Sequence, residues 1–287
     1  MTLITKKHKH YPVLLKEIHN PPAKLYVQGE LPIGPMIALV GTRKPTQYGQ
    51  EIAYRLAYDL ATAGCITVSG LAYGIDSIVH RATLDAGGRT IAVMATGLDR
   101  VYPASHRGLA RDIVAHGGAI LTEYPEGTPG MRYHFPARNR IIAGLSLGTV
   151  VPEADARSGS LITAFQALES NRVVMAVPGN ITSDRSAGPN NLIRAGAISV
   201  GSADDIFSAV GLTIGEQTTG GSSRVGLEGE ILSLLQKGAL RSEFVAGELA
   251  RPIPTILSAL SLLELTGEIR NIGGDTWMVR KAIHQRT

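Results

Sequence analysis

Three loops rich in glycine and hydroxyl residues are candidate phosphate-binding sites in this chain. They are Gly41-Thr42-Arg43, the stretch from Ser69-Gly70 to Asp76, and Ser158-Gly159-Ser160, and each precedes a helical pattern. A glycine lets a ligand approach the backbone, and a helix start presents free N–H groups to an anion. The alternative interpretations are a tight turn, close packing of a helix on a strand, and an ordinary helix cap.

A fourth candidate segment places an aromatic ring and two guanidinium groups at the start of a predicted helix. This segment contains Phe135, Arg138, Asn139 and Arg140. An arginine can bind phosphate through two parallel hydrogen bonds or stack on a nucleobase, and a phenylalanine ring offers a stacking surface. In the alternative interpretation, the two arginines form structural ion pairs with Glu123 or Glu153.

The sequence offers little that would support catalysis. The eight histidines have no metal-binding spacing, and there is no Gly-x-Ser-x-Gly, no Gly-x-Gly-x-x-Gly and no P-loop lysine. Asp99, Glu123 and Glu153 follow predicted strands, but nothing near them specifies a reaction. We therefore expect no catalytic residue, no metal and no cofactor.

The elements that must position these residues follow the pattern of a parallel sheet. From Met36 onward, short apolar runs alternate with longer helical patterns. The predicted strands are 36–40, 66–69, 90–95, 119–122, 149–152, 173–177 and 198–201, and the predicted helices are 49–63, 75–86, 105–115, 137–145, 160–170 and 190–195. This order predicts an α/β fold with a doubly wound, Rossmann-like, mostly parallel sheet. The candidate loops then meet at the carboxyl ends of the strands, along one rim.

Composition and charge restrict the class of protein without identifying it. The 287 residues are 44% hydrophobic and 18% charged, which excludes disorder over most of the length. One cysteine, Cys65, forms no disulfide within the chain, so a cytoplasmic location is expected. The sequence contains no run of about 18 apolar residues, so we expect no membrane span. The net charge of +4 permits nucleic-acid binding, and five lysines against two glutamates lie in residues 1–33.

The pattern divides the chain into four regions. Residues 1–33 form an N-terminal extension that leads into a main domain over 34–212, and the Gly/Ser/Thr-rich stretch 213–226 is a predicted flexible linker. Predicted helices at 228–235, 242–249 and 254–266, followed by a hairpin around Gly273-Gly274, make 227–287 a winged-helix-like domain. Its third helix carries no lysine or arginine, so we expect this domain to contact protein rather than duplex DNA.

The motifs taken together resemble the DNA-processing protein A family (DprA, also called Smf). The resemblance covers roughly Tyr11 to Phe207, and the segments that carry it are Gly41–Arg43, Ser69–Asp76, Thr96–Asp99 with Tyr102-Pro103, Glu123–Pro125, Phe135–Ser146, Arg157–Ala164 and Val177–Gly179. One departure is Thr42, where the family usually has serine. The helical domain that some members carry before this region is not expected, because about ten residues precede Tyr11.

The resemblance implies a mediator of DNA recombination rather than an enzyme. Such a protein binds and protects the single-stranded DNA that enters in natural transformation, and it loads RecA on that DNA. The residues implied for binding are Gly41, Thr42, Arg43, Ser69, Gly70, Phe135, Arg138, Asn139, Arg140, Ser158, Gly159 and Ser160. A homodimer is implied through Leu192, Ile193 and Ile198, and single-strand-binding protein is a further expected partner.

The alternative from another class is a nucleotide hydrolase of the Rossmann-like nucleoside monophosphate type. Such proteins usually carry a Pro-Gly-Gly loop with a glutamate nearby. Here Pro178-Gly179 is followed by Asn180, which disfavours this alternative.

Overall fold

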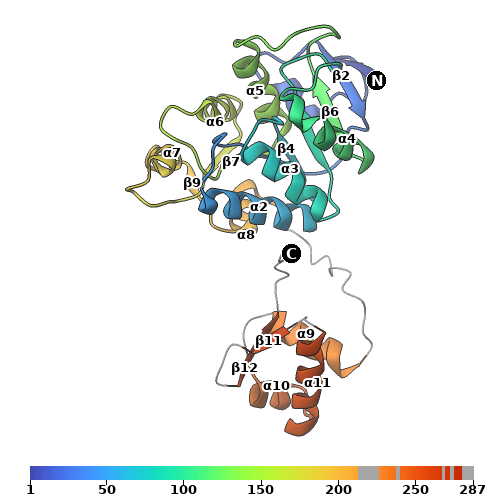
Figure 1. Ribbon diagram of the computed structural model, residues 1–287, viewed down its shortest axis with the longest axis vertical. Helices are drawn as coiled ribbons and strands as arrows, with labels where there is room; N and C mark the ends of the chain where they lie inside the picture. The colour runs from blue at the N-terminus through green and yellow to red at the C-terminus, as the bar shows by residue number, and fades with distance from the viewer. Residues whose placement is uncertain (213–225, 237–239, 267–268, 272–274, 280–287) are drawn as a thin grey trace. The chain divides into compact units, whose positions relative to one another are not determined.

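The computed structural model describes residues 1–212, 226–236, 240–266, 269–271 and 275–279, and the chain divides into two compact units, Met1–Gly215 and Glu216–Thr287 (Figure 1). Within these residues, no helix is both long enough and apolar enough to cross a membrane.

The first unit is built on a sheet of nine strands in the order β1-β2-β6-β5-β4-β3-β7-β8-β9. The strands are β1 Thr2–Thr5, β2 Lys24–Gly29, β3 Met36–Leu39, β4 Ile66–Ser69, β5 Thr90–Val93, β6 Ala119–Thr122, β7 Gly148–Val151, β8 Val173–Ala176 and β9 Ile198–Ser199. The strands from β3 to β9 pair in parallel, whereas β1 and β2 add an antiparallel edge beside β6.

Helices cover both faces of this sheet (Figure 1). They are α1 Val13–Glu17, α2 Gln47–Thr62, α3 Ile75–Asp85, α4 Arg107–Ala115, α5 His134–Leu145, α6 Gly159–Glu169, α7 Ala187–Arg194 and α8 Ala203–Val210. Apolar residues of α1, α5 and α6 form one core with the strands, whereas those of α2, α3 and α8 form another core with the same strands. The predicted doubly wound α/β architecture is therefore confirmed.

The strand order creates a crevice beside β3. The chain passes from β3 to β4, β5 and β6 on one side and then returns to β7 on the other side of β3. The loops that follow β3 and β7 therefore leave the sheet in opposite directions. In open α/β sheets, ligands bind at such a switch point, outside the carboxyl ends of the strands.

The seven predicted strands are present: β4 and β6 end where predicted, and the other five end one or two residues earlier, at the carboxyl rim. Val40, Met94, Ala95 and Val177 are buried but lie in loops, because the chain leaves the ladder there to form the rim. The sequence analysis assigned no element to residues 1–33, where the structure has β1, α1 and β2. It also missed α8, whose start carries a capping box between Ser202 and Asp205.

The second unit is small and has its own core. It contains α9 Leu227–Gln236, α10 Ser242–Glu248 and α11 Ile253–Leu265, with β10 Leu240–Arg241, β11 Ile269–Asn271 and β12 Thr276–Val279 in the sheet order β10-β12-β11. Trp277 is buried in that core. β11 and β12 pair as the predicted hairpin, whose glycine turn lies outside the described residues, as do residues 213–225 of the predicted linker. The winged-helix assignment stays a prediction.

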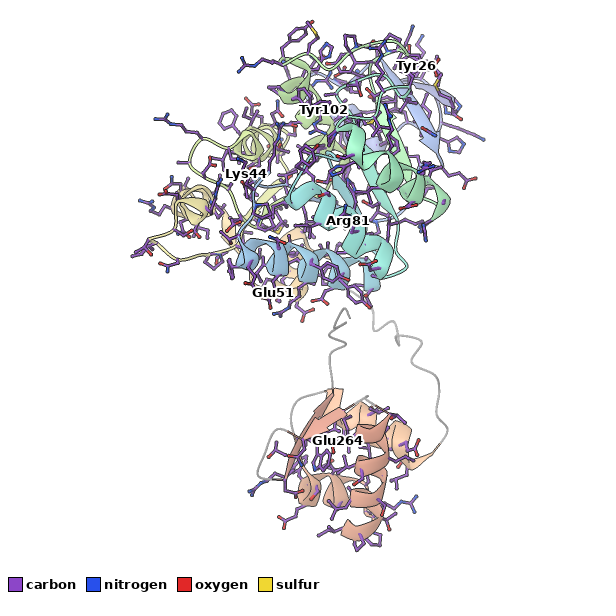
Figure 2. The ribbon with its side chains drawn as sticks, viewed as in Figure 1. Tyr26, Lys44, Glu51, Arg81, Tyr102 and Glu264 are labelled. Carbon is purple, nitrogen blue, oxygen red and sulfur yellow. The ribbon has the colours of Figure 1, made fainter. Side chains whose placement is uncertain are left out.

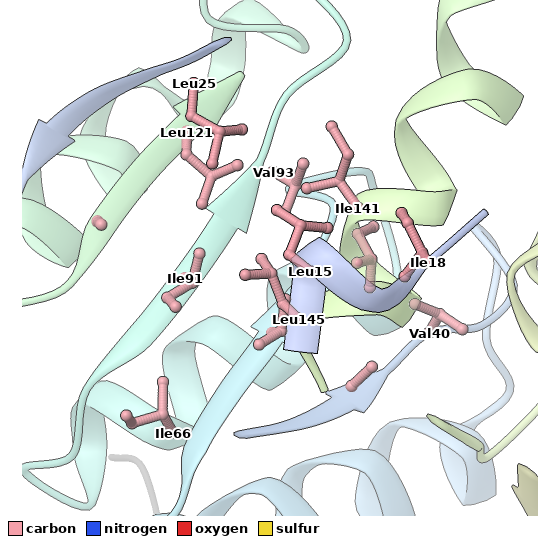
Figure 3. Close-up of a cluster of buried hydrophobic side chains, with 14 of the residues drawn as sticks. Leu15, Ile18, Leu25, Val40, Ile66, Ile91, Val93, Leu121, Ile141 and Leu145 are labelled. Carbon is pink, nitrogen blue, oxygen red and sulfur yellow. The ribbon is translucent and has the colours of Figure 1, made fainter. Parts of the chain in front are cut away.

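The N-terminal segment belongs to the core of the first unit. Leu15 of α1 and Ile18, which directly follows α1, pack beside Ile141 and Leu145 of α5 (Figure 3). The close approach depends on Gly144, where an added Cβ would lie 2.7 Å from Ile18 Cγ2 and 2.9 Å from Leu15 Cδ1. α1 is therefore positioned by α5, the helix that also carries Phe135 and Arg138.

We expect Leu15→Ala to lower the free energy of unfolding by about 2–5 kcal/mol, because it leaves a cavity between α1 and α5. Val13→Ala is the matched control, since Val13 lies on the same short helix and is 71% exposed. Urea denaturation of both variants measures the difference. Equal, small effects would mean that α1 contributes nothing to the core.

Candidate nucleic-acid interface

A cavity of about 420 Å³ opens at the carboxyl ends of β3 and β7. Its walls come from the loop Gly41–Lys44, the start of α5 and the loop that leads from Asp155 into α6. A second cavity of about 110 Å³ adjoins it, since Arg43, Phe135 and Arg138 line both. The two cavities occupy the switch point of the sheet.

The structure brings together most of the residues that the sequence proposed. The larger cavity is lined by Gly41, Thr42, Arg43, Phe135, Arg138, Asn139, Ser158, Gly159 and Ser160, and the smaller one also by Gly70. Ser69 lines neither cavity, because its hydroxyl donates a 2.7 Å hydrogen bond to the carbonyl of Leu39 and joins β4 to β3. Arg140 also lines neither cavity.

Arg140 faces away from the cavities because of helix geometry. Residues two apart on an α-helix point about 200° apart, so Arg138 and Arg140 cannot both face one pocket. Arg140 instead forms an ion pair with Glu123, which directly follows β6. For Arg140, the structure therefore shows the alternative interpretation of the sequence, an ion pair with Glu123.

Arg138 forms the floor of both cavities. Its side chain is buried, and Nη1 donates hydrogen bonds to the carbonyl of Gly70, at 2.7 Å, and to the carbonyl of Val93. Nε donates to Asn139 Oδ1 at 2.9 Å. An added Cβ at Gly70 would lie 2.2 Å from Nη1, so only glycine leaves room for the guanidinium group.

The charge of Arg138 is balanced from the other side of Gly70. Asp76 accepts hydrogen bonds from the amides of Gly70, at 3.1 Å, and Ala72, at 3.4 Å. Burial raises the pKa of Asp76, and the positive charge of Arg138 opposes that rise. Burial lowers the pKa of Arg138 to about 10, against the effect of Asp76. The floor of the pocket is therefore a compensated pair of charges around one glycine.

The free positive charge lies at the mouth of the larger cavity. Arg43, Lys44 and Arg157 are exposed, and none of the three forms an ion pair with a carboxylate in the part of the chain that the structure describes. Arg185 also lines the cavity, but its Nη1 pairs with Asp155 at 2.9 Å. Three cations are thus available to an anionic ligand.

The two helix starts beside the cavity differ in what they can bind. The start of α2 already holds an anion, because Glu153 accepts hydrogen bonds from the amide of Thr46, at 2.8 Å, and from its hydroxyl, at 2.6 Å. The start of α6 is capped by Ser158 and has no acidic residue in its first turn. A phosphate therefore meets a favourable helix dipole with no carboxylate bound to it at α6 rather than at α2.

Aromatic rings line the cavities beside these cations. Tyr73 and Tyr102 line the smaller cavity and are 49% and 53% exposed. The Phe135 ring lies 5.5 Å from that of Tyr102, and the Arg43 guanidinium lies 5.8 Å from the centre of the Phe135 ring. Exposed rings next to cations are the combination that binds unpaired bases and their phosphates.

Five cationic or aromatic residues that line the cavities were not among the predicted site residues: Lys44, Tyr73, Tyr102, Arg157 and Arg185. Tyr73, Tyr102 and Arg157 stand inside motifs that carried the family resemblance, so the signal was present. Lys44 directly follows such a motif. Arg185 precedes α7 and carried no local signal.

The carboxylates of the cavity are engaged by the chain itself. Asp76 and Asp155 line it, and they bind backbone amides and Arg185, respectively. The described residues contain no group of three or more His, Cys, Asp or Glu side chains that could hold a metal ion. The charged side chains of the cavity that have no ion-pair partner among the described residues are therefore cations, not carboxylates.

Comparison with known proteins supports the same interpretation. The family model described as DNA recombination-mediator protein A matches residues 2–211. The chain belongs to this family. DNA processing protein DprA of Bacillus subtilis is 45% identical over 202 residues, which cover 69% of this chain and 68% of that protein. Protein Smf of Escherichia coli is 36% identical over 295 aligned positions, covering 99% of this chain and 79% of that protein.

Solved structures of the family superimpose on the first unit. DprA from Streptococcus pneumoniae has a TM-score of 0.67 at 39% identity, over 72% of this chain and 73% of that one. DNA processing protein A from Helicobacter pylori, described for its unique single-stranded DNA binding mode, has a TM-score of 0.64 at 30% identity, over 72% of this chain and 95% of that one. The family assignment therefore rests on sequence and on fold.

We expect Arg138→Gln to lower the free energy of unfolding by about 3 kcal/mol or more, because it leaves Asp76 buried without its compensating charge. The double variant Arg138→Gln, Asp76→Asn is expected to be more stable than Arg138→Gln alone, because it removes both charges. Urea denaturation of the two single variants and the double variant measures the coupling. If the losses of the single variants simply add, the two charges do not compensate each other.

Proposed function

We propose that the paired cavities bind single-stranded DNA and that the protein is a mediator of DNA recombination. The observation that carries the proposal is the meeting of Arg43, Lys44 and Arg157 with the rings of Tyr102 and Phe135 at the switch point of the sheet. Membership in the recombination-mediator family and the likeness to a single-stranded DNA-binding relative support it.

The arrangement favours single strands over duplex. A single strand can turn its base faces onto the exposed rings while its phosphates contact the cations at the mouth. In a duplex the base faces are stacked inside the helix, so only the phosphate contacts remain. We infer that the contacts are made without reading the base sequence, because every base has a face that stacks.

We propose further that the protein acts without catalysis, protects incoming DNA in natural transformation and loads RecA on it in the cytoplasm. The engagement of Asp76 and Asp155 within the chain supports a binding role over the hydrolase alternative. RecA, single-strand-binding protein and a second copy of the chain are the proposed partners.

The segment proposed for the homodimer is Leu192, Ile193 and Ile198. Ile198 lies on the edge strand β9 and is 43% exposed, Ile193 is partly buried, and Leu192 packs against the core of the first unit. The exposed edge of β9 is compatible with contact to a second copy.

We expect the protein to bind an oligo-dT strand more tightly than a duplex of equal length. Arg43→Ala should weaken binding about tenfold and reduce the slope of log affinity against log salt by about 0.7, the contribution of one phosphate contact. Arg81→Ala, on the exposed surface of α3, is the control (Figure 2). Gel-shift titrations at several salt concentrations measure these values. Equal affinity for duplex, or equal effects of the two variants, would contradict the proposal.

The mediator role is tested on strands coated with single-strand-binding protein. Added protein is expected to speed the assembly of RecA filaments, followed through RecA's ATP hydrolysis, and Arg43→Ala should lose this effect in proportion to its loss of DNA affinity. Assembly that is equally fast without the protein would contradict the role while leaving DNA binding in place.

A further inference from the structure

The chain segment that follows β1 reaches the same rim as the DNA-binding cavities. β1 is antiparallel to β2, and β2 is antiparallel to β6, so β1 runs in the direction of the parallel strands. Tyr26 of β2 pairs with Thr122 at the end of β6, and Thr5 at the end of β1 pairs with Lys24. Residues 6–10 therefore leave the sheet at its carboxyl rim, beyond the end of β6.

This segment carries a dense positive charge. Lys6, Lys7, His8, Lys9 and His10 follow one another and are all exposed, and we call them the N-terminal basic loop. Lys24, opposite Thr5, adds a further exposed cation. Among the described residues, no carboxylate forms an ion pair with any of these lysines, since Glu17 pairs with Arg172 instead.

The N-terminal basic loop is held by the fold at both ends. The amide of Lys6 donates to the carbonyl of Ala23 at 3.2 Å, and the amide of Tyr11 donates to that of His8 at 3.0 Å. The buried Tyr11 hydroxyl donates to Pro22 at 2.7 Å. Burial raises the pKa of Tyr11 to about 12, and the charges of Arg140 and Glu123 also act on it. Tyr11, the residue that follows the loop, is therefore within electrostatic range of the Arg140–Glu123 ion pair.

Aromatic side chains connect that ion pair to the cavities. The Tyr124 ring, next to Glu123, stacks on His134 with ring centres 4.0 Å apart, and the Tyr133 ring lies 4.6 Å from His134. His134 is followed by Phe135, which lines both cavities. Tyr133 is 67% exposed. The rim between the N-terminal basic loop and the cavities thus offers the exposed Tyr133 ring, beside the partly buried Tyr124 ring, for stacking with a base.

The carboxylates between the N-terminal basic loop and the cavities have cations close to them, which reduces their repulsion of a polyanion. Glu123 is neutralised by Arg140, and Asp99 by Arg100 at 3.4 Å. Glu126 and Arg132 are both exposed, and their charges are opposite. The positive charge without a nearby carboxylate in this part of the rim is therefore that of the lysines in the N-terminal basic loop.

We propose that the N-terminal basic loop, with Lys24, is a second phosphate-binding site for the same single strand of DNA, which runs along the carboxyl rim from the cavities across the Tyr124–Tyr133 rings. This inference rests on the proposed function, because it adds length to the same binding path. In this arrangement Lys6, Lys7 and Lys9, which follow β1, contact phosphates five strand positions away from Arg43, which follows β3.

The topology gives the length of DNA that such a path needs. β1 and β3 are separated by β2, β6, β5 and β4, which is five strand spacings of about 4.8 Å, or roughly 24 Å. A strand of duplex DNA advances roughly 3.4 Å per nucleotide, so about seven nucleotides at that spacing cover this span, and an extended single strand needs fewer. In Figure 2 the labels of Lys44, Tyr102 and Tyr26 follow the same direction, from near α6 toward β2.

The test compares two oligonucleotide lengths with the full-length protein. We expect K6Q/K7Q/K9Q to bind a 20-nucleotide oligo-dT about tenfold more weakly than wild type, with a salt slope smaller by about 2, the sum of three contacts of about 0.7 each. With a 3-nucleotide oligo-dT, which is too short to reach from the cavities to the loop even when extended, the same variant should bind like the control. Fluorescence anisotropy at several salt concentrations measures both lengths.

The control variant R81Q/R89Q/R111Q removes the same charge from exposed arginines on α3, before β5 and on α4. If the two triple variants lose affinity equally at both lengths, the inference is wrong and the proposed function stands. If wild type binds neither oligonucleotide, both are wrong. If K6Q/K7Q/K9Q instead loses binding to phosphatidylserine vesicles without any length-dependent effect on DNA, the loop contacts membranes and the inference is overturned.

Discussion

The buried guanidinium group of Arg138 is the interaction on which the binding site depends. A charge removed from water costs several kcal/mol unless hydrogen bonds and an opposite charge compensate it. Here the compensation comes from the carbonyls of Gly70 and Val93 and from the charge of Asp76. These groups stand at the ends of β4 and β5 and the start of α3, so one side chain of α5 ties three other elements together at the switch point. The floor of the pocket is thereby fixed before any ligand arrives.

This arrangement separates structural charges from ligand-binding charges. The carboxylates nearest the site are each assigned to the chain's own donors: Asp76 to the floor, Asp155 to Arg185, and Glu153 to the start of α2. Arg43, Lys44 and Arg157 are left without such partners in the described residues. A net charge of +4 over 287 residues would predict little affinity for a polyanion. The local excess at the mouth arises because the acids are engaged elsewhere, which net charge does not reveal.

Sequence periodicity predicted the seven parallel strands, because strands buried on both faces read as continuous apolar runs. It missed β1 and β2, because β1 buries one of its four residues and β2 buries two of its six, so neither forms a continuous apolar run. The site residues were predicted as a set, yet Arg140 was placed with Arg138 although helix geometry separates positions two apart. The hydrogen bond from Thr46 at the start of α2 to Glu153, by contrast, joins residues 107 positions apart, so no local sequence pattern predicts it.

The antiparallel edge explains how a fold with a compact pocket can bind a linear polymer. A switch point between two parallel strands offers one crevice, which suits a ligand the size of a nucleotide. A single strand of DNA presents phosphates at regular intervals and needs contacts spread along a line. Adding β1 and β2 beyond β6 extends the carboxyl rim, and because β1 runs parallel to β6 its end delivers the N-terminal basic loop to that same rim. Had β1 paired in the opposite direction, the lysines would lie at the amino ends of the strands, on the far edge of the sheet from Arg43. The direction of one four-residue edge strand therefore decides whether the chain's second cluster of positive charge adds to the DNA-binding surface.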